Sequence, residues 1–169
     1  TGPDEYHERV NNNAFTNALV KETLEIAIQT AEYLKTNRLP AFDTLSESFK
    51  DGPFLEEFQE MLDHFYVPQP NPDNLVIEQF DRYLTLEEVE LSELKSRVLN
   101  KHEYWGGGNG LATTTQILKQ ADVVLMLNLF KHSFSPEVKK ANWEFYEPRT
   151  EHGSSLSPCI YALVAADIG

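Results

Sequence analysis

The sequence predicts an all-α protein in which one helix follows another and the polar chemistry lies in the loops between them. Apolar residues recur at three- and four-residue spacing in several segments long enough to form helices. The strict alternation of apolar and polar residues that is typical of strands is nearly absent. Prolines and glycines fall between the periodic segments, where they would end the helices.

The first long helix is predicted to follow Asn11–Asn13, which supply residues suited to a helix cap. One apolar stripe runs along it, formed by Leu24, Ala27, Ile28, Ala31 and Leu34. Asn37 and Pro40 are expected to end it, and a further helical turn or two is expected over residues 41–49.

A second, shorter helix is predicted from Phe54 to Phe65, because its aromatic and leucine side chains repeat at helical spacing and Pro68 follows. Residues 75–80 are expected to form either a short strand or a buried extended segment. Residues 84–99 are acidic with apolar residues at mixed spacing, which indicates short helical pieces and loop.

Three helices are predicted in the C-terminal half. Thr113 and Gln116 have the spacing of a capping box, so a helix that is apolar nearly all round is expected over residues 114–130. Ser135 starts another, which Pro148 ends, and a final helix is expected over residues 156–168, with Pro158 in its first turn and hydroxyl caps before it. Lys119, Gln120 and Asp122 lie on the apolar helix, either at solvated first turns or as ligand-binding groups.

Composition narrows the class of protein. The 169 residues make one domain or part of one, and the net charge of −13 makes a nucleic-acid duplex an unfavourable partner. We expect no membrane span, because no uninterrupted apolar run approaches ~20 residues. The single cysteine, Cys159, excludes an internal disulfide and fits a reducing compartment such as the cytoplasm, and its apolar neighbours predict an inert core thiol. The chain opens without a methionine and closes directly after a helical run, so we expect a fragment of a longer polypeptide.

An anion-binding site is suggested by the stretch from Glu147 to Cys159. It gathers polar side chains around one glycine just before the last predicted helix: Arg149, Thr150, His152, Ser154 and Ser155. A helix start offers free N–H groups and the positive end of the helix dipole, which attract phosphate or carboxylate. An ordinary helix cap is the alternative reading of the same residues.

A second polar group lies near the amino end, where Asp4 and Glu5 follow a turn. A carboxylic acid in a partly apolar site has a raised pKa and can protonate a leaving oxygen, whereas the plainer alternative is an exposed turn. His7 has no second His or Cys at zinc-ligand spacing, so no metal site is expected. The glycine-rich loop from Tyr104 to Gly110 has no Gly-Lys-Ser/Thr after it, which favours a tight turn beside a cleft over a nucleotide-binding loop.

Several motifs in this sequence together resemble glycoside hydrolase family 65, the family of maltose, trehalose, kojibiose and nigerose phosphorylases. They are Gly2-Pro-Asp-Glu-Tyr-His, Asn12-Asn13-Ala14 with Thr16-Asn17, Ile77-Glu-Gln-Phe, Gln116-Ile-Leu-Lys-Gln-Ala-Asp-Val, and Glu147-Pro-Arg-Thr with His152 and Ser154-Ser155-Leu156-Ser157. The resemblance implies that residues 1–169 are the second half of an (α/α)6 barrel catalytic domain. The family's N-terminal β-sandwich, linker and first barrel helices would then be absent from this sequence.

The resemblance also implies an activity, the inverting phosphorolysis of an α-glucosidic disaccharide to β-glucose 1-phosphate. Glu5 would be the proton donor, and Lys119 and Gln120 would hold hydroxyls of the glucosyl unit. His152, Ser154 and Ser155 would bind phosphate, to which we add Arg149 and Thr150. Disaccharide and inorganic phosphate would be the substrates, with no further cofactor, and the full-length enzyme could be a homodimer.

Two alternatives remain open at the level of sequence. Gly153 stands where the family usually has an aspartate, and Glu151 adds negative charge beside the proposed anion, so a family-65-type hydrolase with Glu151 or Glu147 as base is the second hypothesis. The third is a non-catalytic helical module that binds carbohydrate or a partner. The leaving sugar would be selected by loops near the site, of which Tyr104–Gly110 is one candidate. By itself, half a barrel is expected to fold poorly and to be inactive.

Overall fold

The computed structural model describes residues 2–37, 40, 44, 53–100 and 102–169. The chain divides into two compact units, one formed by Thr1–Thr16 with Val67–Gly169 and the other by Asn17–Tyr66. Of the helical turn predicted over residues 41–49, only Thr44 is described, so the rest of that prediction lies outside the described residues.

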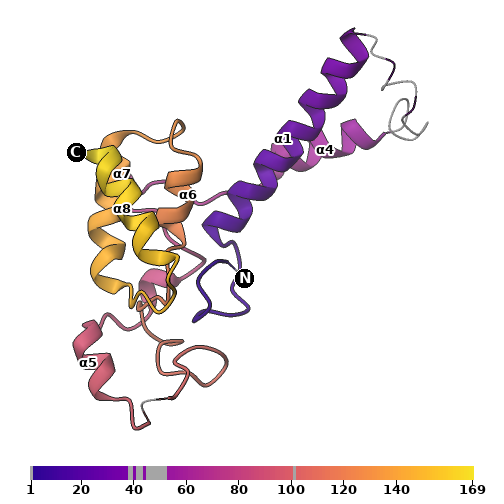
Figure 1. Cartoon of the computed structure of the whole chain (residues 1–169). Helices are drawn as coiled ribbons and strands as arrows, with labels where there is room; N and C mark the ends of the chain where they lie inside the picture. Colours follow the sequence, from indigo (N-terminus) through magenta and orange to yellow (C-terminus); the bar gives the residue numbers. More distant parts are fainter. Residues whose placement is uncertain (1, 38–39, 41–43, 45–52, 101) are drawn as a thin grey trace. The chain divides into compact units, whose positions relative to one another are not determined.

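The described elements are helical, and Figure 1 shows them in chain order by colour. They are α1 (Ala14–Asn37), α4 (Phe54–His64), η1 (Tyr83–Thr85), α5 (Leu91–Ser96), α6 (Val123–Leu129), α7 (Pro136–Tyr146), η2 (Glu147–Arg149) and α8 (Ser157–Ile168). Within the described ranges, β pairing is limited to isolated bridges, and no strand forms. The prediction of an all-α chain is therefore confirmed.

Helix α1 begins as the sequence predicted, because the side-chain oxygen of Asn13 accepts the backbone N–H of Thr16 at 2.9 Å. In the Asn17–Tyr66 unit, which holds most of α1 and all of α4, the amide of Asn17 donates to the carbonyl of Tyr66 at 2.8 Å. The rings of Phe54 and Phe58 pack one helical turn apart on α4, with centroids 4.1 Å apart.

The other unit is built on α6, α7 and α8, which pack against one another (Figure 1). Asn142 of α7 is fully buried, accepts the N–H of Ile77 at 2.8 Å and donates to the carbonyl of Leu75 at 2.9 Å. Tyr146 donates its hydroxyl to the carbonyl of Ile77 at 2.5 Å. These bonds hold the chain at Leu75 and Ile77 against α7. Residues 75–80 form no strand and are mostly buried, so the buried segment is the correct alternative, but Leu75 has a left-handed backbone with φ of 62° and the segment is not extended throughout.

The predicted helix over residues 114–130 is wrong over its first half, because the helix begins only at Val123. The hydroxyl of Thr113 does not cap a helix but donates to the carbonyl of Gly107 at 2.5 Å. The side-chain amide of Gln116 donates to the carbonyls of Leu84 and Leu86, both at 3.3 Å. The segment 113–122 pairs through isolated bridges with Glu87 on one side and with Thr150 on the other. These bridges give backbone N–H and C=O groups of the segment hydrogen-bond partners without a helix.

The last helix matches the prediction in its extent and in the place of Pro158, but not in its cap. Leu156 is the N-cap residue and makes no side-chain cap bond, whereas the hydroxyl of Ser157 accepts the backbone N–H of Ala121 at 3.0 Å. Cys159 is exposed and its thiol donates to the carbonyl of Leu156, so the prediction of a core thiol is also wrong.

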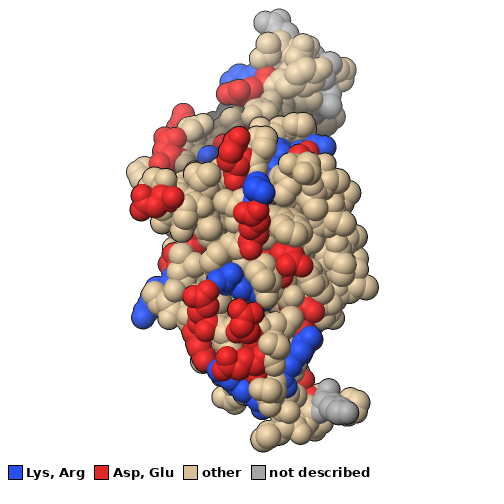
Figure 2. Space-filling model, turned by 90° about the vertical axis from the view of Figure 1, so that its left-hand side faces the viewer, with Lys and Arg blue, Asp and Glu red and all other residues tan. Residues whose placement is uncertain are grey.

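Charged side chains are scattered over the face seen in Figure 2, with Lys and Arg lying between the Asp and Glu residues. The acidic excess is therefore spread over this face, as expected for solvated side chains, and not gathered into one patch. In the part of the chain that the structure describes, every helix is too short or too polar to cross a bilayer.

Candidate active site

The site is built around the extended residues Leu118 and Lys119, which lie beside the loop that precedes α8. Leu118 donates its N–H to the carbonyl of Arg149 and accepts the N–H of Glu151, both at 2.8 Å. The N–H of Gly153 then donates to the carbonyl of Lys119 at 2.9 Å. These bonds place the predicted sugar-binding residues beside the predicted phosphate-binding loop.

The amino-terminal segment lies against the same residues. The N–H of Lys119 donates to the Asp4 carboxylate at 2.9 Å, and the side-chain amide of Gln120 donates to the carbonyl of Pro3 at 2.5 Å. The hydroxyl of Tyr6 donates to the carboxylate of Glu151. The structure thus brings together all three polar groups that the sequence singled out, although more than a hundred residues separate the first from the others.

Glu5 points into solvent, with its side chain 54% exposed, and its Oε2 lies 2.5 Å from the Nζ of Lys119. The hydrogen bond and the charge of Glu5 raise the pKa of Lys119, so the lysine is a cation at neutral pH. Tyr104 supports both residues, because its hydroxyl donates to the Glu5 carbonyl at 2.7 Å and its ring centroid lies 5.6 Å from the Lys119 Nζ.

The glycine-rich loop from Tyr104 to Gly110 is pressed against the Glu5 segment. A Cβ atom on Gly106 would lie 2.7 Å from the Cα of Tyr6 and 2.9 Å from the carbonyl oxygen of Glu5, so only glycine fits there. The ring of Trp105 stacks on that of Tyr6, with centroids 6.1 Å apart. The loop is therefore a close neighbour of the candidate acid, as the predicted turn beside a cleft requires.

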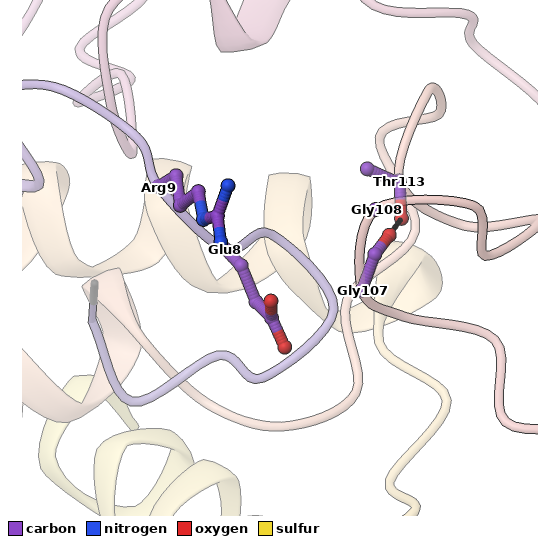
Figure 3. Close-up of a pocket in the computed structure, with 5 residues that line it drawn as sticks. All are labelled: Glu8, Arg9, Gly107, Gly108 and Thr113. Carbon is purple, nitrogen blue, oxygen red and sulfur yellow. Dashed lines mark hydrogen bonds between the residues drawn. The ribbon is translucent and has the colours of Figure 1, made fainter.

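A cavity of about 170 Å³ opens between this loop and the residues that follow Glu5 (Figure 3). It is lined by Glu8, Arg9, Gly107, Gly108 and Thr113. Its wall is fixed on one side by the bond from the Thr113 hydroxyl to the Gly107 carbonyl, drawn as a dashed line in Figure 3. Arg9 adopts a left-handed backbone conformation with φ of 54°, which turns the chain at the cavity's edge.

Gln120 offers an acceptor that the protein leaves unused. Its amide nitrogen is bound to Pro3, but its Oε1 is buried and has no hydrogen-bond partner in the described part of the chain. A buried carbonyl oxygen without a donor is costly, so this atom is suited to accept a hydroxyl from a ligand.

Arg149 and Thr150 are bound within the protein itself. The guanidinium of Arg149 donates to Gln116 and to the carbonyl of Phe145, pairs with Glu88, and lies 4.0 Å from the centroid of the Phe145 ring. Thr150 is 2% exposed, and its hydroxyl lies 2.7 Å from both the Tyr146 carbonyl and the Tyr161 hydroxyl. These contacts favour a part in shaping the loop, and direct binding of phosphate by either residue stays a prediction.

The other three predicted anion-binding residues lie immediately before α8. His152 has a left-handed backbone with φ of 57°, and its Nδ1 lies 3.0 Å from the hydroxyl of Ser157. Burial lowers the pKa of His152, which favours a neutral ring that can donate one N–H. Ser154 is partly buried and Ser155 is exposed, and both lie just before the twelve-residue helix α8. The hydroxyl of Ser154 accepts the N–H of Leu156 at 3.4 Å.

Glu151 and Gly153 fit each other sterically. A Cβ on residue 153 would lie 2.6 Å from the Oε2 of Glu151 and 3.3 Å from the Cγ of Lys119. The glycine therefore leaves room for the Glu151 carboxylate to reach the hydroxyl of Tyr6. Burial and the contact with Glu151 raise the pKa of Tyr6, so its hydroxyl stays protonated and keeps donating.

A buried polar cluster behind Glu5 was not assigned a role from the sequence. We call Asp4, His7, Asn13, Gln79 and Asp122 the Asp4 cluster, and all five are at most 3% exposed. Asp122 accepts the N–H of Asp4 and the side-chain amide of Asn13, both at 3.2 Å. Burial, and then the charge of Asp4, raise the pKa of Asp122 to about 7. The sequence predicts Asp122 either at a solvated first turn or in a ligand site, and its burial against Asp4 and Asn13 excludes the solvated position.

Comparison with known proteins identifies what these residues resemble. The family model of the glycosyl hydrolase family 65 central catalytic domain matches residues 1–169. A nigerose phosphorylase from Lachnoclostridium phytofermentans is 47% identical over 163 residues, which is 96% of this chain and 22% of the relative. A 1,2-alpha-glucosylglycerol phosphorylase from Bacillus selenitireducens is 42% identical over 99% of this chain and 22% of the relative.

A solved structure provisionally named a kojibiose phosphorylase, from the human microbiome, has the same fold with a TM-score of 0.77 and 27% sequence identity. The match covers 100% of this chain and 23% of that structure. The chain thus spans about a fifth of the length of the relatives it matches. The predicted fold class, an all-α part of a larger (α/α)6 catalytic domain, is confirmed by this likeness.

Proposed function

The chain belongs to glycosyl hydrolase family 65, and from that membership we propose that the full-length protein is an inverting phosphorylase of an α-glucosidic disaccharide. The products would be β-glucose 1-phosphate and a free sugar. The names of the two relatives above, both phosphorylases, support this reading. The observation that carries it is the meeting of the Glu5–Lys119 pair with the loop 150–153 that leads into α8.

Glu5 donates the proton to the glycosidic oxygen as the leaving sugar departs. In the structure its carboxylate is paired with the ammonium of Lys119. We propose that Lys119 moves from Glu5 to a hydroxyl of the glucosyl unit when the sugar binds. Glu5, freed of the cation, takes up a proton from solvent as the sugar binds and then delivers that proton to the glycosidic oxygen.

Gln120 binds the same glucosyl unit through its Oε1, since this buried oxygen lacks a donor among the described residues. Its amide nitrogen stays on the carbonyl of Pro3, which fixes the direction of the oxygen. The loop Tyr104–Gly110 lies beside Glu5 and contributes to the selection of the leaving sugar.

Phosphate is bound by His152, Ser154 and Ser155 near the positive end of the α8 dipole. The N–H of Ser157 is already bound to the carbonyl of Ser154 and Pro158 has no N–H, so the side chains carry the binding. Arg149 and Thr150 hold the loop and complete the predicted phosphate-binding set. Phosphate is already an anionic nucleophile, so it takes the place of the carboxylate base that an inverting hydrolase needs about 6.5–9.5 Å from its acid. No other cofactor is required by this scheme.

A hydrolase is the second candidate, because Glu151 places a carboxylate beside Lys119 and the Tyr6 hydroxyl. Glu151 or Glu147 would then activate water. Either enzyme would need Glu5 as the acid, so the two candidates differ only in the nucleophile.

The deciding experiment incubates the full-length protein with a panel of glucosyl disaccharides, with and without inorganic phosphate. We expect glucose 1-phosphate to form only with phosphate, and Glu5→Gln to slow turnover by ~10²–10⁴-fold. Glu144→Gln, an exposed carboxylate on α7, is the matched control and should leave turnover unchanged. Release of glucose without phosphate would replace the phosphorylase by the hydrolase. Full activity of Glu5→Gln would show that Glu5 is not the acid, and sugar binding without any product from the parent would leave a non-catalytic carbohydrate-binding module.

The cellular setting is also a proposal. We place the enzyme in the cytoplasm, where the single thiol of this chain stays reduced, and we propose that the full-length enzyme is a homodimer. Size-exclusion chromatography with light scattering on the full-length protein tests the second statement.

A further inference from the structure

Two neighbouring carboxylates near the amino end have opposite surroundings. The side chain of Glu5 is 54% exposed, whereas that of Asp4 is 1% exposed. The scheme above uses only Glu5. A buried charge next to a candidate acid needs either partners or a purpose, and its contacts show which groups it holds.

Each oxygen of the Asp4 carboxylate has two partners. Oδ1 accepts the backbone N–H of Lys119 at 2.9 Å and that of Tyr6 at 3.3 Å. Oδ2 lies 2.6 Å from the Nδ1 of His7 and 3.3 Å from the amide nitrogen of Gln79. The carboxylate is therefore fully used, and two of its four partners are backbone groups of the segments that carry the proposed site.

His7 completes the arrangement. Its Nδ1 faces the Asp4 carboxylate, and its Nε2 lies 2.8 Å from the carbonyl oxygen of Thr115, which can only accept. One proton must therefore lie between His7 and Asp4 in addition to the proton on Nε2. The pair is buried against the rings of Phe80 and Tyr83, with ring centroids 5.2 and 6.0 Å from that of His7.

The backbone bonds from Asp4 act directly on the groups of the proposed reaction. Glu5 lies between Asp4 and Tyr6, so the bond to the Tyr6 N–H fixes the turn from which Glu5 projects. The bond to the Lys119 N–H fixes the start of the lysine side chain that meets Glu5 at 2.5 Å. Loss of the Asp4 charge would loosen both ends of this pair.

We propose, on the basis of the function proposed above, that Asp4 is a positioning residue for proton donation: its buried carboxylate, held by His7, fixes Glu5 and Lys119 relative to each other. Asp4 does not touch the substrate, and its effect on proton donation comes from the placement of Glu5, for which Lys119 is the partner that Asp4 also holds. A displacement of a reacting group by ~1 Å can cost about a hundredfold in rate, so the effect of losing Asp4 is large enough to measure.

The test is a double-mutant cycle on kcat in the full-length protein, with Asp4→Asn, Glu5→Gln and the double variant. Asp4→Asn in the presence of Glu5 is expected to lower kcat by roughly 10–100-fold. In the Glu5→Gln background the same change should lower kcat by less than about threefold, because the group that it positions is already gone. Product is measured over hours, so that the slow variants are quantified.

A residue with a merely structural role would give equal losses in both backgrounds, and that result would overturn the proposal, as would an unchanged kcat in Asp4→Asn. Asp81→Asn is the matched control, since Asp81 lies in the same unit and its exposed carboxylate accepts the side-chain amide of Asn12 at 2.8 Å, away from Asp4 and Glu5. It should leave kcat unchanged in both backgrounds.

His7 supplies a second pair of variants in case Asp4→Asn does not fold. Asparagine places an N–H donor near the position of the histidine Nδ1, so His7→Asn should keep kcat within about threefold of the parent, whereas His7→Leu should lower it as Asp4→Asn does. Equal activity of the two His7 variants would overturn the proposal. If the parent releases glucose without phosphate, the proposed phosphorylase fails, but the cycle still tests Asp4, since a hydrolase needs the same acid.

Discussion

Asp122 is a carboxylate enclosed by protein, close to a second carboxylate on Asp4 and to the amide of Asn13. Burial raises its pKa from 3.8 to about 7, and the nearby charge of Asp4 adds to the rise. In the native state Asp122 therefore keeps its proton up to a pH near 7, whereas in the unfolded chain it loses the proton near pH 4.

The sign of the resulting pH dependence follows from linkage. Between about pH 4 and pH 7 the native state binds a proton that the unfolded state does not, so the contribution of Asp122 to stability is present at low pH and is lost as the pH rises toward 7. Its size is at most roughly 4 kcal/mol, since one pKa unit corresponds to about 1.4 kcal/mol.

The change Asp122→Asn is accordingly predicted to have a more favourable effect on the free energy of unfolding at pH 8 than at pH 5, with the parent protein as the reference at each pH. Asparagine imitates the protonated acid, so the variant avoids the buried charge at high pH. Urea unfolding of the full-length protein at the two pH values measures the difference, with Asp81→Asn as an exposed control. The same change in the free energy of unfolding at both values would contradict the raised pKa.

Ser154 and Ser155 give a prediction for the anion site. The double change to alanine removes two hydroxyl donors, and a hydrogen bond to a charged group contributes about 1.5–3 kcal/mol, so KM for phosphate should rise at least tenfold. The KM for the disaccharide should change little. Ser96→Ala, an exposed serine whose hydroxyl donates to the carbonyl of Glu93, serves as control. Unchanged phosphate kinetics in the double variant would place the anion elsewhere.

Individual site residues could be named from the sequence only as far as local pattern and resemblance reach. Glu5, Lys119 and His152 lie in short motifs, and the structure brings their segments together. The buried Asp4 cluster that holds these residues in place could not be predicted in the same way, because it joins residues up to 118 positions apart. Nothing in the local sequence of Thr115 indicates that its carbonyl receives the ring of His7.

At the scale of elements, the loop Tyr104–Gly110 depends on the absence of a side chain at Gly106. A Cβ atom added to Gly106 would lie only 2.7 Å from the Cα of Tyr6. Gly106→Ala is predicted to destabilise the full-length protein by about 1–3 kcal/mol, the usual cost of forcing extra atoms into a packed contact. Gly108→Ala in the same loop is the matched control, since a Cβ there meets nothing within 4 Å. Unfolding in urea measures both, and equal stability of the two variants would contradict the close approach.

The helices that end at proline or begin at a good cap were predicted well, and α7 with its Ser135 cap is the clearest case. The segment 113–122 failed for a definite physical reason. Thr113 and Gln116 have the spacing of a capping box, but their side chains find carbonyls of Gly107, Leu84 and Leu86 instead. Tertiary hydrogen bonds outweighed local propensity there, and no local pattern reports those partners.

At the scale of the molecule, large apolar side chains remain in contact with water near the C-terminal helices. Leu129 is 53% exposed, Leu156 71% and Leu163 55%. The relatives are about five times longer than this chain, and we predict that further residues of a larger packed domain cover these leucines in the full-length protein.

Residues 1–169 produced alone are therefore predicted to unfold with low cooperativity, to bind the dye ANS and to form no glucose 1-phosphate. The exposed leucines lack the covering that a complete core supplies. Near-UV circular dichroism and ANS fluorescence, compared with those of the full-length protein, measure this directly. A sharp unfolding transition without ANS binding would contradict it.

The bond from the Lys119 N–H to Asp4 joins positions 115 residues apart. On a ribosome that adds ~5–20 residues per second, the turn that carries Asp4 is synthesised roughly 6 to 23 seconds before Lys119. Until then the nascent Asp4 and His7 remain hydrated, and the proposed pair of Glu5 and Lys119 cannot assemble. The proposed site can therefore form only late in biosynthesis, after the segment that contains Lys119 has been synthesised and has packed against Asp4 and His7.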